Sequence, residues 1–214
     1  MKAKTMEVFI PSGNLTLEGS LELPDQSPPF PGVLFCHPHP PQGGNMDNNV
    51  VVAVGRALVK KGIAVLRFNF RGVGLSKGAY DQGIGEQDDA RAALKFLLKR
   101  EEIDSQRVGI GGYSFGGMIA FSVGVPEDTV KALAGVSPVM REDILKGCQK
   151  PKIIVHGTVD SMIPAEQIKR ETSKAAGPVE VRMIEGADHF WWGFEEQLAE
   201  IVANFFVSRL ANNS

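Results

Sequence analysis

A chain of 214 residues with 43% apolar and 22% charged side chains can bury a sizeable core and is expected to form a single domain over residues 1–214. Its formal charge of −2, without a basic run, speaks against nucleic acid or an anionic membrane as a partner. No apolar run approaches the ~18 residues of a membrane helix, and the first residues lack the apolar segment of a signal peptide. Because there are only two cysteines, we expect Cys36 and Cys148 to be free thiols in a cytoplasmic protein.

The predicted elements begin with a β-hairpin. A short apolar run at residues 8–10, turn residues at 11–14 and a period-two pattern over residues 15–23 are typical of two antiparallel strands. Short runs rich in Val and Ile then alternate with segments of helical length. The further predicted strands are residues 33–36, 64–70, 108–111, 133–136, 153–155 and 179–184, and the predicted helices are residues 49–61, 86–100, 115–124, 165–175 and 195–210.

This alternation predicts an α/β fold. Strands that are apolar on both faces and separated by helices form a mostly parallel sheet with helices on both faces. With the hairpin at one edge, the predicted sheet has eight strands. At the start of helix 86–100, Glu86, Asp88 and Asp89 are interpreted as charges that oppose the helix dipole, and no chemical role is assigned to them.

A serine stands at a predicted turn from strand to helix. Residues 112–116 read Gly-Tyr-Ser-Phe-Gly, the G-x-S-x-G pattern, between strand 108–111 and helix 115–124. The two glycines leave room for a strained turn that lifts the hydroxyl of Ser114 clear of the sheet, beside a helix N-terminus that favours developing negative charge. We predict that Ser114 is a nucleophile. Glycine-rich turns after strands also serve packing or phosphate binding, so the pattern alone leaves those alternatives open.

A nucleophilic serine needs a base and an acid that orients the base. His189 directly follows the last predicted strand, and Asp160 follows strand 153–155. Both would therefore lie with Ser114 at the carboxyl ends of parallel strands, where open α/β sheets carry their sites. This arrangement predicts a catalytic triad in the chain order serine, aspartate, histidine. The alternatives are a capping role for Asp160 at the helix near Pro164 and a surface position for His189.

Three other side chains compete for these roles. Asp143 follows strand 133–136 and is the backup acid. Asp188 is a poor candidate acid, because adjacent residues rarely point at one another. His156 lies within an apolar strand and is expected to be structural.

Two longer motifs give the chain a family resemblance. The first is His37-Pro38-His39-Pro40, followed by Gly43-Gly44-Asn45-Met46 and Asn48-Asn49. The second is Phe70-Arg71-Gly72-Val73-Gly74-Leu75-Ser76-Lys77-Gly78, followed by Asp81, Gly83, Gly85-Glu86 and Asp89-Ala90. Together with the serine turn, they resemble the α/β-hydrolase superfamily and, more narrowly, its small cap-less hydrolases, over about residues 31–192. The resemblance implies an α/β-hydrolase fold without a cap domain and a hydrolase or esterase whose natural substrate stays open.

The resemblance also implies an oxyanion hole made of two backbone amides. One is the amide of Phe115, directly after the nucleophile; the family's H-G-x loop, aligned at His37, puts the other on His39. Flanking prolines have no N–H and fix φ, which would preset the direction of the His39 amide. The alternative is a metal bound by both histidines, but a metal site needs a third or fourth ligand that this loop does not offer. We expect neither a metal nor a cofactor, and a packing role for the His37 side chain.

The predicted function is hydrolysis of carboxylic esters of small to medium acyl groups through an acyl-enzyme intermediate. A short connection at residues 138–150 predicts an open cleft, for which the candidate lining residues are Met46, Met140, Phe190, Trp191 and Trp192. Alternatives on the same fold are a thioesterase, a dienelactone-type hydrolase, a peptidase or an acyltransferase. A non-catalytic binding protein is the alternative from another class. The expected partner is a small-molecule ester, and a homodimer is compatible with the sequence.

Overall fold

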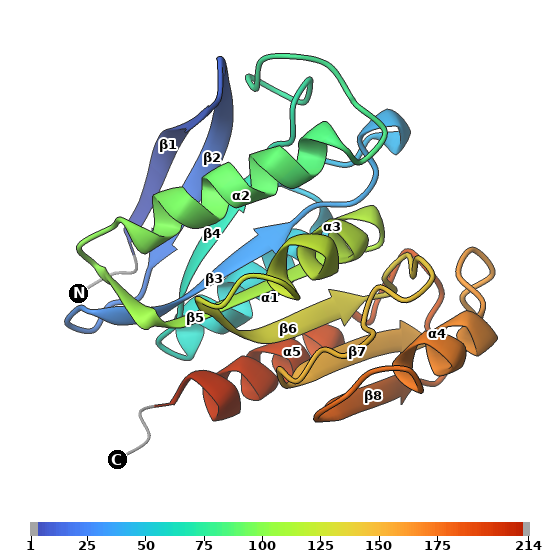
Figure 1. The fold of residues 1–214 in the computed structure, drawn as a ribbon. Helices are drawn as coiled ribbons and strands as arrows, with labels where there is room; N and C mark the ends of the chain where they lie inside the picture. Colours follow the sequence, from blue (N-terminus) through green and yellow to red (C-terminus); the bar gives the residue numbers. More distant parts are fainter. Residues whose placement is uncertain (1–3, 212–214) are drawn as a thin grey trace.

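The computed structural model describes residues 4–211, which form one eight-stranded sheet flanked by helices (Figure 1). The strands are β1 (Lys4–Ser12), β2 (Leu15–Leu23), β3 (Phe30–Cys36), β4 (Ala64–Phe68), β5 (Ile103–Tyr113), β6 (Val130–Val136), β7 (Lys152–Gly157) and β8 (Val179–Ile184). The helices are α1 (Asn49–Lys60), α2 (Gly85–Leu98), α3 (Phe115–Gly124), α4 (Ala165–Thr172) and α5 (Glu195–Leu210), with one 3₁₀ turn at Pro40–Gln42. Each predicted helix and strand is therefore present, with bounds shifted by a few residues; only the 3₁₀ turn was not expected.

The strand order is β1-β2-β4-β3-β5-β6-β7-β8. The hairpin β1–β2 is antiparallel and joins β4 in an antiparallel pair, whereas β4, β3, β5, β6, β7 and β8 run parallel to one another. The predicted α/β-hydrolase fold with an edge hairpin is confirmed. Because all six parallel strands point the same way, the loops after β3, β5, β7 and β8 emerge at one end of the sheet.

Helices cover both faces of the sheet (Figure 1). On one face, α2 and α3 bury Ala90, Leu97 and Phe121 against the strands, and Ile168 of α4 joins this apolar core. On the other face, α1 and α5 pack together and bury Val54 and Phe206. This two-sided burial explains why the central strands read as uninterrupted apolar runs in the sequence.

The acids at the start of α2 do more than oppose the helix dipole. Glu86 and Asp89 are fully buried. The Glu86 carboxylate accepts the amides of residues 81 and 83, at 2.8 and 2.7 Å. Asp89 accepts the backbone amide and two guanidinium nitrogens of Arg71 at 2.9–3.0 Å. The interpretation as plain helix-start charges describes Asp88, which pairs with Arg91 at the surface. It is incomplete for the two buried acids, whose hydrogen bonds hold the loop between β4 and α2.

Residues 137–151, between β6 and β7, contain turns and one isolated bridge residue, Lys146, but no helix and no cap domain. The carboxyl end of the sheet is therefore not covered by an inserted domain at this point. In residues 4–211, no helix has the length and apolar character needed to cross a membrane.

Candidate active site

Ser114 sits in a strained turn at the end of β5. Its backbone has φ 55° and ψ −117°, a conformation that L-residues rarely adopt, and α3 begins at the next residue. The glycines two positions away on either side are required by close contacts. A Cβ on Gly112 would lie 2.3 Å from the carbonyl oxygen of Gly116, and a Cβ on Gly116 would lie 2.3 Å from that of Cys36. The tight turn expected from the G-x-S-x-G pattern is present, and it holds the serine hydroxyl at the carboxyl end of the sheet.

The structure brings the three predicted triad residues together. The hydroxyl of Ser114 lies 3.0 Å from Nε2 of His189, and Nδ1 of His189 lies 2.8 Å from Oδ2 of Asp160. All three side chains are buried or nearly so. Tyr113, next to the serine, donates its hydroxyl to the carbonyl oxygen of His189 at 2.6 Å and so fixes the loop that carries the imidazole. The alternative surface position for His189 is therefore wrong.

Asp160 is held by three donors. Its Oδ1 accepts the amides of Met162 and Ile163 at 2.9 Å each, and its Oδ2 accepts a hydrogen bond from Nδ1 of His189 at 2.8 Å. Burial, the largest single effect, raises the pKa of Asp160, but these hydrogen bonds and the charge of His189 outweigh it and lower the pKa to about 2. The acid is therefore ionised at neutral pH and fixed in one orientation.

Sequence reasoning did not identify Ser137. This fully buried residue accepts a hydrogen bond from the indole nitrogen of Trp191 at 3.3 Å. Because an indole N–H can only donate, the Ser137 hydroxyl keeps its own proton for another acceptor, and Ser137 is among the groups that lower the pKa of Asp160. The one sequence signal was its position directly after strand β6, which also applies to many structural residues.

Acid conditions should remove the stabilisation that ionised Asp160 provides. Its pKa of about 2 in the folded protein lies below the ordinary 3.8, so the contribution is fully present above about pH 4 and is lost as the pH falls toward 2. We expect the gap in unfolding free energy between wild type and Asp160→Asn to narrow over that interval, as measured by urea denaturation at successive pH values. A gap that stays constant from pH 5 to pH 2.5 would contradict this assignment.

The competing residues lie elsewhere or serve the loops. Asp143 forms ion pairs with Lys146 and Lys174 at the surface, and its amide binds Glu171. Asp188 accepts the amides of residues 190 and 191, so it shapes the loop that follows His189. Neither carboxylate replaces Asp160 as the partner of His189.

His156 is buried in β7, in line with its expected structural role. Its Nε2 bonds to the carbonyl oxygen of Ile163 at 3.0 Å, and burial is the main cause of its lowered pKa. Its Nδ1 has no partner among the described residues and lies 4.0 Å from Asp160. The imidazole is therefore held neutral beside the buried acid.

Two amides next to Ser114 have no hydrogen-bond partner in the described part of the chain, those of His39 and Phe115. Their side-chain rings are neighbours, with centroids 5.3 Å apart. The N-terminus of α3 also packs directly on the end of β3, because a Cβ on Gly116 would meet the carbonyl oxygens of both Cys36 and His37. Two free donors thus lie near the serine, on the two loops where the family resemblance put them.

The histidines of the His37–Pro40 motif bind protein groups. Nδ1 of His37 donates to the carbonyl oxygen of Pro38 at 2.7 Å, and its Nε2 accepts the amide of Phe70 at 3.0 Å. Burial, the main cause, lowers the pKa of His37 to about 4 and keeps the ring neutral. Nε2 of His39 bonds to the hydroxyl of Tyr80 at 2.9 Å. Among the described residues, no three His, Cys, Asp or Glu side chains gather in a group that could hold a metal ion.

A small cavity of about 120 Å³ opens beside Ser114. Its lining includes Gln42 and Asn48 from the loop after β3, and Met162 and Phe190 from the loops after β7 and β8. Among the predicted lining residues, only Phe190 borders this cavity. Trp191 and Met140 are buried core residues, Trp192 is exposed outside it, and Met46 is half-buried.

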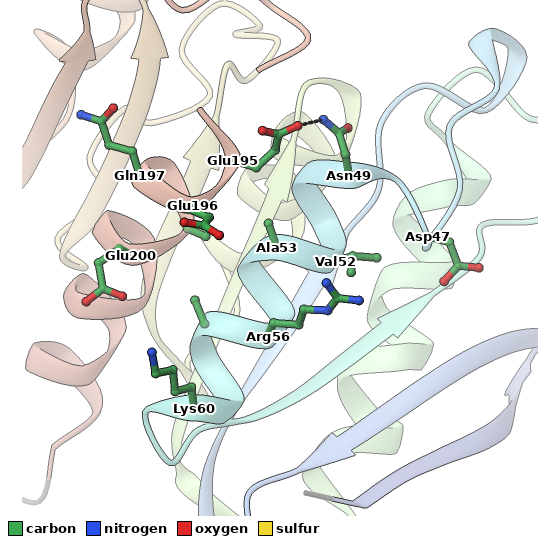
Figure 2. A pocket seen from close by; sticks show the side chains of 12 residues that line it. Asp47, Asn49, Val52, Ala53, Arg56, Lys60, Glu195, Glu196, Gln197 and Glu200 are labelled. Carbon is green, nitrogen blue, oxygen red and sulfur yellow. Dashed lines mark hydrogen bonds between the residues drawn. The ribbon is translucent and has the colours of Figure 1, made fainter. Parts of the chain in front are cut away.

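A larger groove of about 890 Å³ runs between α1 and α5 (Figure 2). None of the triad residues borders it, so it is a separate surface feature. At its end, the side chain of Asn49 donates to Glu195 at 3.0 Å and to the carbonyl oxygen of Phe190 at 3.2 Å. Asn49, which the first motif contains without an evident role, thereby fastens the loop after His189 to α1.

Comparisons with known proteins agree with this fold. The family model described as the dienelactone hydrolase family matches residues 79–209. An uncharacterized protein of Rickettsia prowazekii is 33% identical over 197 residues, which is 87% of this chain and 82% of that protein. The solved structure of an alpha-beta serine hydrolase homologue from Coxiella burnetii is 33% identical, with a TM-score of 0.85 over 93% of this chain and 96% of that one. A serine hydrolase without lid from Xanthomonas campestris is 26% identical, with a TM-score of 0.85 over 100% and 98% of the two chains.

Proposed function

The chain belongs to the dienelactone hydrolase family, and on this premise we propose that it is a serine hydrolase that cleaves carboxylic esters of small to medium acyl groups. The observation that carries the proposal is the continuous hydrogen-bonded series from Ser114 through His189 to Asp160 at the carboxyl end of the sheet. Such a series activates a serine hydroxyl, because the imidazole accepts its proton while the carboxylate stabilises the resulting imidazolium.

In the proposed reaction, Oγ of Ser114 attacks the ester carbonyl carbon and His189 takes its proton at Nε2. The carbonyl oxygen becomes an oxyanion and binds the free amides of Phe115 and His39. His189 then protonates the leaving alcohol as the tetrahedral intermediate collapses to an acyl-enzyme. Water, deprotonated by His189, attacks this acyl group; His189 returns the proton to Ser114 and the carboxylic acid leaves.

A lactone is a second candidate substrate, because the matched family is described by its dienelactone hydrolases. A lactone is an internal carboxylic ester, so the same steps would open its ring and give one hydroxy acid. A panel of esters, thioesters, lactones and amides, run beside Ser114→Ala, separates these substrate classes.

Covalent labelling tests the proposal independently of the natural substrate. A fluorophosphonate phosphonylates an activated serine, so we expect one label per chain in the wild type, on Ser114, and none in Ser114→Ala. Ser173→Ala, which removes an exposed serine at the end of α4, is the matched control and should label like the wild type. Absence of labelling in purified, folded wild-type protein would favour a non-catalytic binding protein and overturn the proposal.

A further inference from the structure

Large apolar side chains are exposed at the end of the molecule that carries Ser114. Within residues 4–211, ten large hydrophobic residues are exposed. Six of them lie in loops that follow parallel strands: Leu75 and Ile84 after β4, Val159 and Met162 after β7, and Phe190 and Trp192 after β8. Exposed apolar surface is costly in water, and its concentration around a site is typical of a surface that binds an apolar group.

Two of these side chains border the cavity at the serine. Met162 and Phe190 are 45% and 53% exposed, and both line the same cavity as Ser114 and His189. They therefore extend the cavity wall outward into solvent. The protein core leaves these apolar surfaces uncovered, so an apolar group of a bound ligand could pack against them.

The backbones of both residues are fixed by the catalytic loops. The amide of Met162 donates to Asp160, and the amide of Phe190 donates to Asp188, both at 2.9 Å. The side chain of Asn49 donates to the carbonyl oxygen of Phe190. The Phe190 ring packs edge-on to the imidazole of His189, with the ring centroids 5.9 Å apart. A substrate would thus meet apolar side chains that are already positioned, which lowers the entropic cost of binding.

The cavity itself is small. Its volume of about 120 Å³ lies well below the roughly 300–1,000 Å³ of pockets that enclose drug-sized ligands, so it suits a short acyl or alcohol group. Among the lining side chains, Gln42 and Asn48 are polar and offer little to a long hydrocarbon chain, whereas Met162 and Phe190 are apolar and exposed. One side of a larger ester would have to leave the cavity, and these two side chains are the exposed apolar surface at the cavity that it could cover.

We propose that Met162 and Phe190 form a subsite for the extended apolar half of an ester whose other half is small. The inference rests on the proposed function and names its substrate class: esters with one short group in the cavity and one aliphatic or aromatic group lying across these two side chains. Both residues determine specificity and take no part in bond making.

Two ester series test the subsite and distinguish the acyl from the alcohol side. Methyl esters of acids from acetate to octanoate vary the acyl side, and acetates of alcohols from methanol to octanol vary the other, all below their aggregation concentrations. In the wild type we expect kcat/KM to rise at least about tenfold with chain length in one of the two series. In Phe190→Ala and Met162→Ala, the ratio of kcat/KM for the longest ester to that for the shortest should fall about five- to tenfold, mainly through KM.

Phe9→Ala is the matched control. Phe9 is a phenylalanine of similar exposure, 58%, on the edge strand β1, and its loss should leave the chain-length profile unchanged. A flat or falling wild-type profile in both series, or equal losses for short and long esters in the subsite variants, would overturn the subsite while short-ester turnover still supported the proposed function. Absence of both turnover and fluorophosphonate labelling would overturn the two together.

Discussion

Replacing His189 by alanine is expected to lower kcat for ester hydrolysis by about six orders of magnitude. The imidazole is the group within 3.0 Å of the Ser114 hydroxyl that can take its proton, and it is bonded on its far side to Asp160 at 2.8 Å. Without it, a serine hydroxyl has no base at neutral pH, and attack on the carbonyl stops. Steady-state hydrolysis of a short ester measures the effect, with enough enzyme to detect the residual rate.

Substituting the two candidate acids, Asp160 and Asp143, tests which of them is the partner of His189. Asp160→Asn should lower kcat by about four orders of magnitude, because an amide cannot hold the required histidine tautomer or stabilise the imidazolium. Asp143→Asn should keep wild-type kcat, because Asp143 pairs with Lys146 and Lys174 at the surface. Equal losses in the two aspartate variants would mean that the assignment of the acid is wrong, provided that urea denaturation shows both variants to be folded under the assay conditions.

The sequence was sufficient to predict that Ser114, Asp160 and His189 share one end of the sheet, because the position of each depends on local order. A residue that directly follows an apolar parallel strand must appear at the carboxyl end of the sheet, whatever the rest of the chain does. Ser114 follows β5, Asp160 lies three residues beyond β7 and His189 five beyond β8. Chain order and strand pattern therefore fixed which end of the sheet they share, although the distances between their atoms required the structure.

The supporting contacts could not be predicted, because they join segments that are far apart in the chain. Ser137 meets Trp191 across 54 positions, and Asn49 reaches Phe190 across 141 positions. Serine and asparagine occur on most protein surfaces, and a pattern in one segment does not reveal its partner in another. The burial of Glu86 was missed for a different reason: its partners are backbone amides only three and five residues away, which leave no signature in side-chain identity.

Gly116→Ala is expected to destabilise the fold by about 4–5 kcal/mol, even though alanine is the better helix former by about 1 kcal/mol. The added Cβ would lie 2.3 Å from the carbonyl oxygen of Cys36 and 2.4 Å from that of His37. Both atoms belong to the backbone at the end of β3, so no side-chain rotation relieves the contact. The end of β3 and the start of α3 must separate, and the clash outweighs the gain in helix propensity.

The same separation should reduce catalysis, because the amides of His39 and Phe115 lie on the two segments that move apart. Loss of one oxyanion donor costs about 10²–10³-fold in kcat, so the folded fraction of Gly116→Ala should lose at least that factor. Gly55→Ala in α1 is the matched control: the atoms nearest to its Cβ would belong to the side chains of Arg67 and Val65, at 3.3 Å or more, and stability should stay within about 1 kcal/mol of wild type. Urea denaturation measures stability. Steady-state ester hydrolysis, divided by the active-site concentration from fluorophosphonate titration, measures turnover. If Gly116→Ala matched Gly55→Ala in stability and turnover, the close packing of β3 on α3 would not be what aligns the two amides.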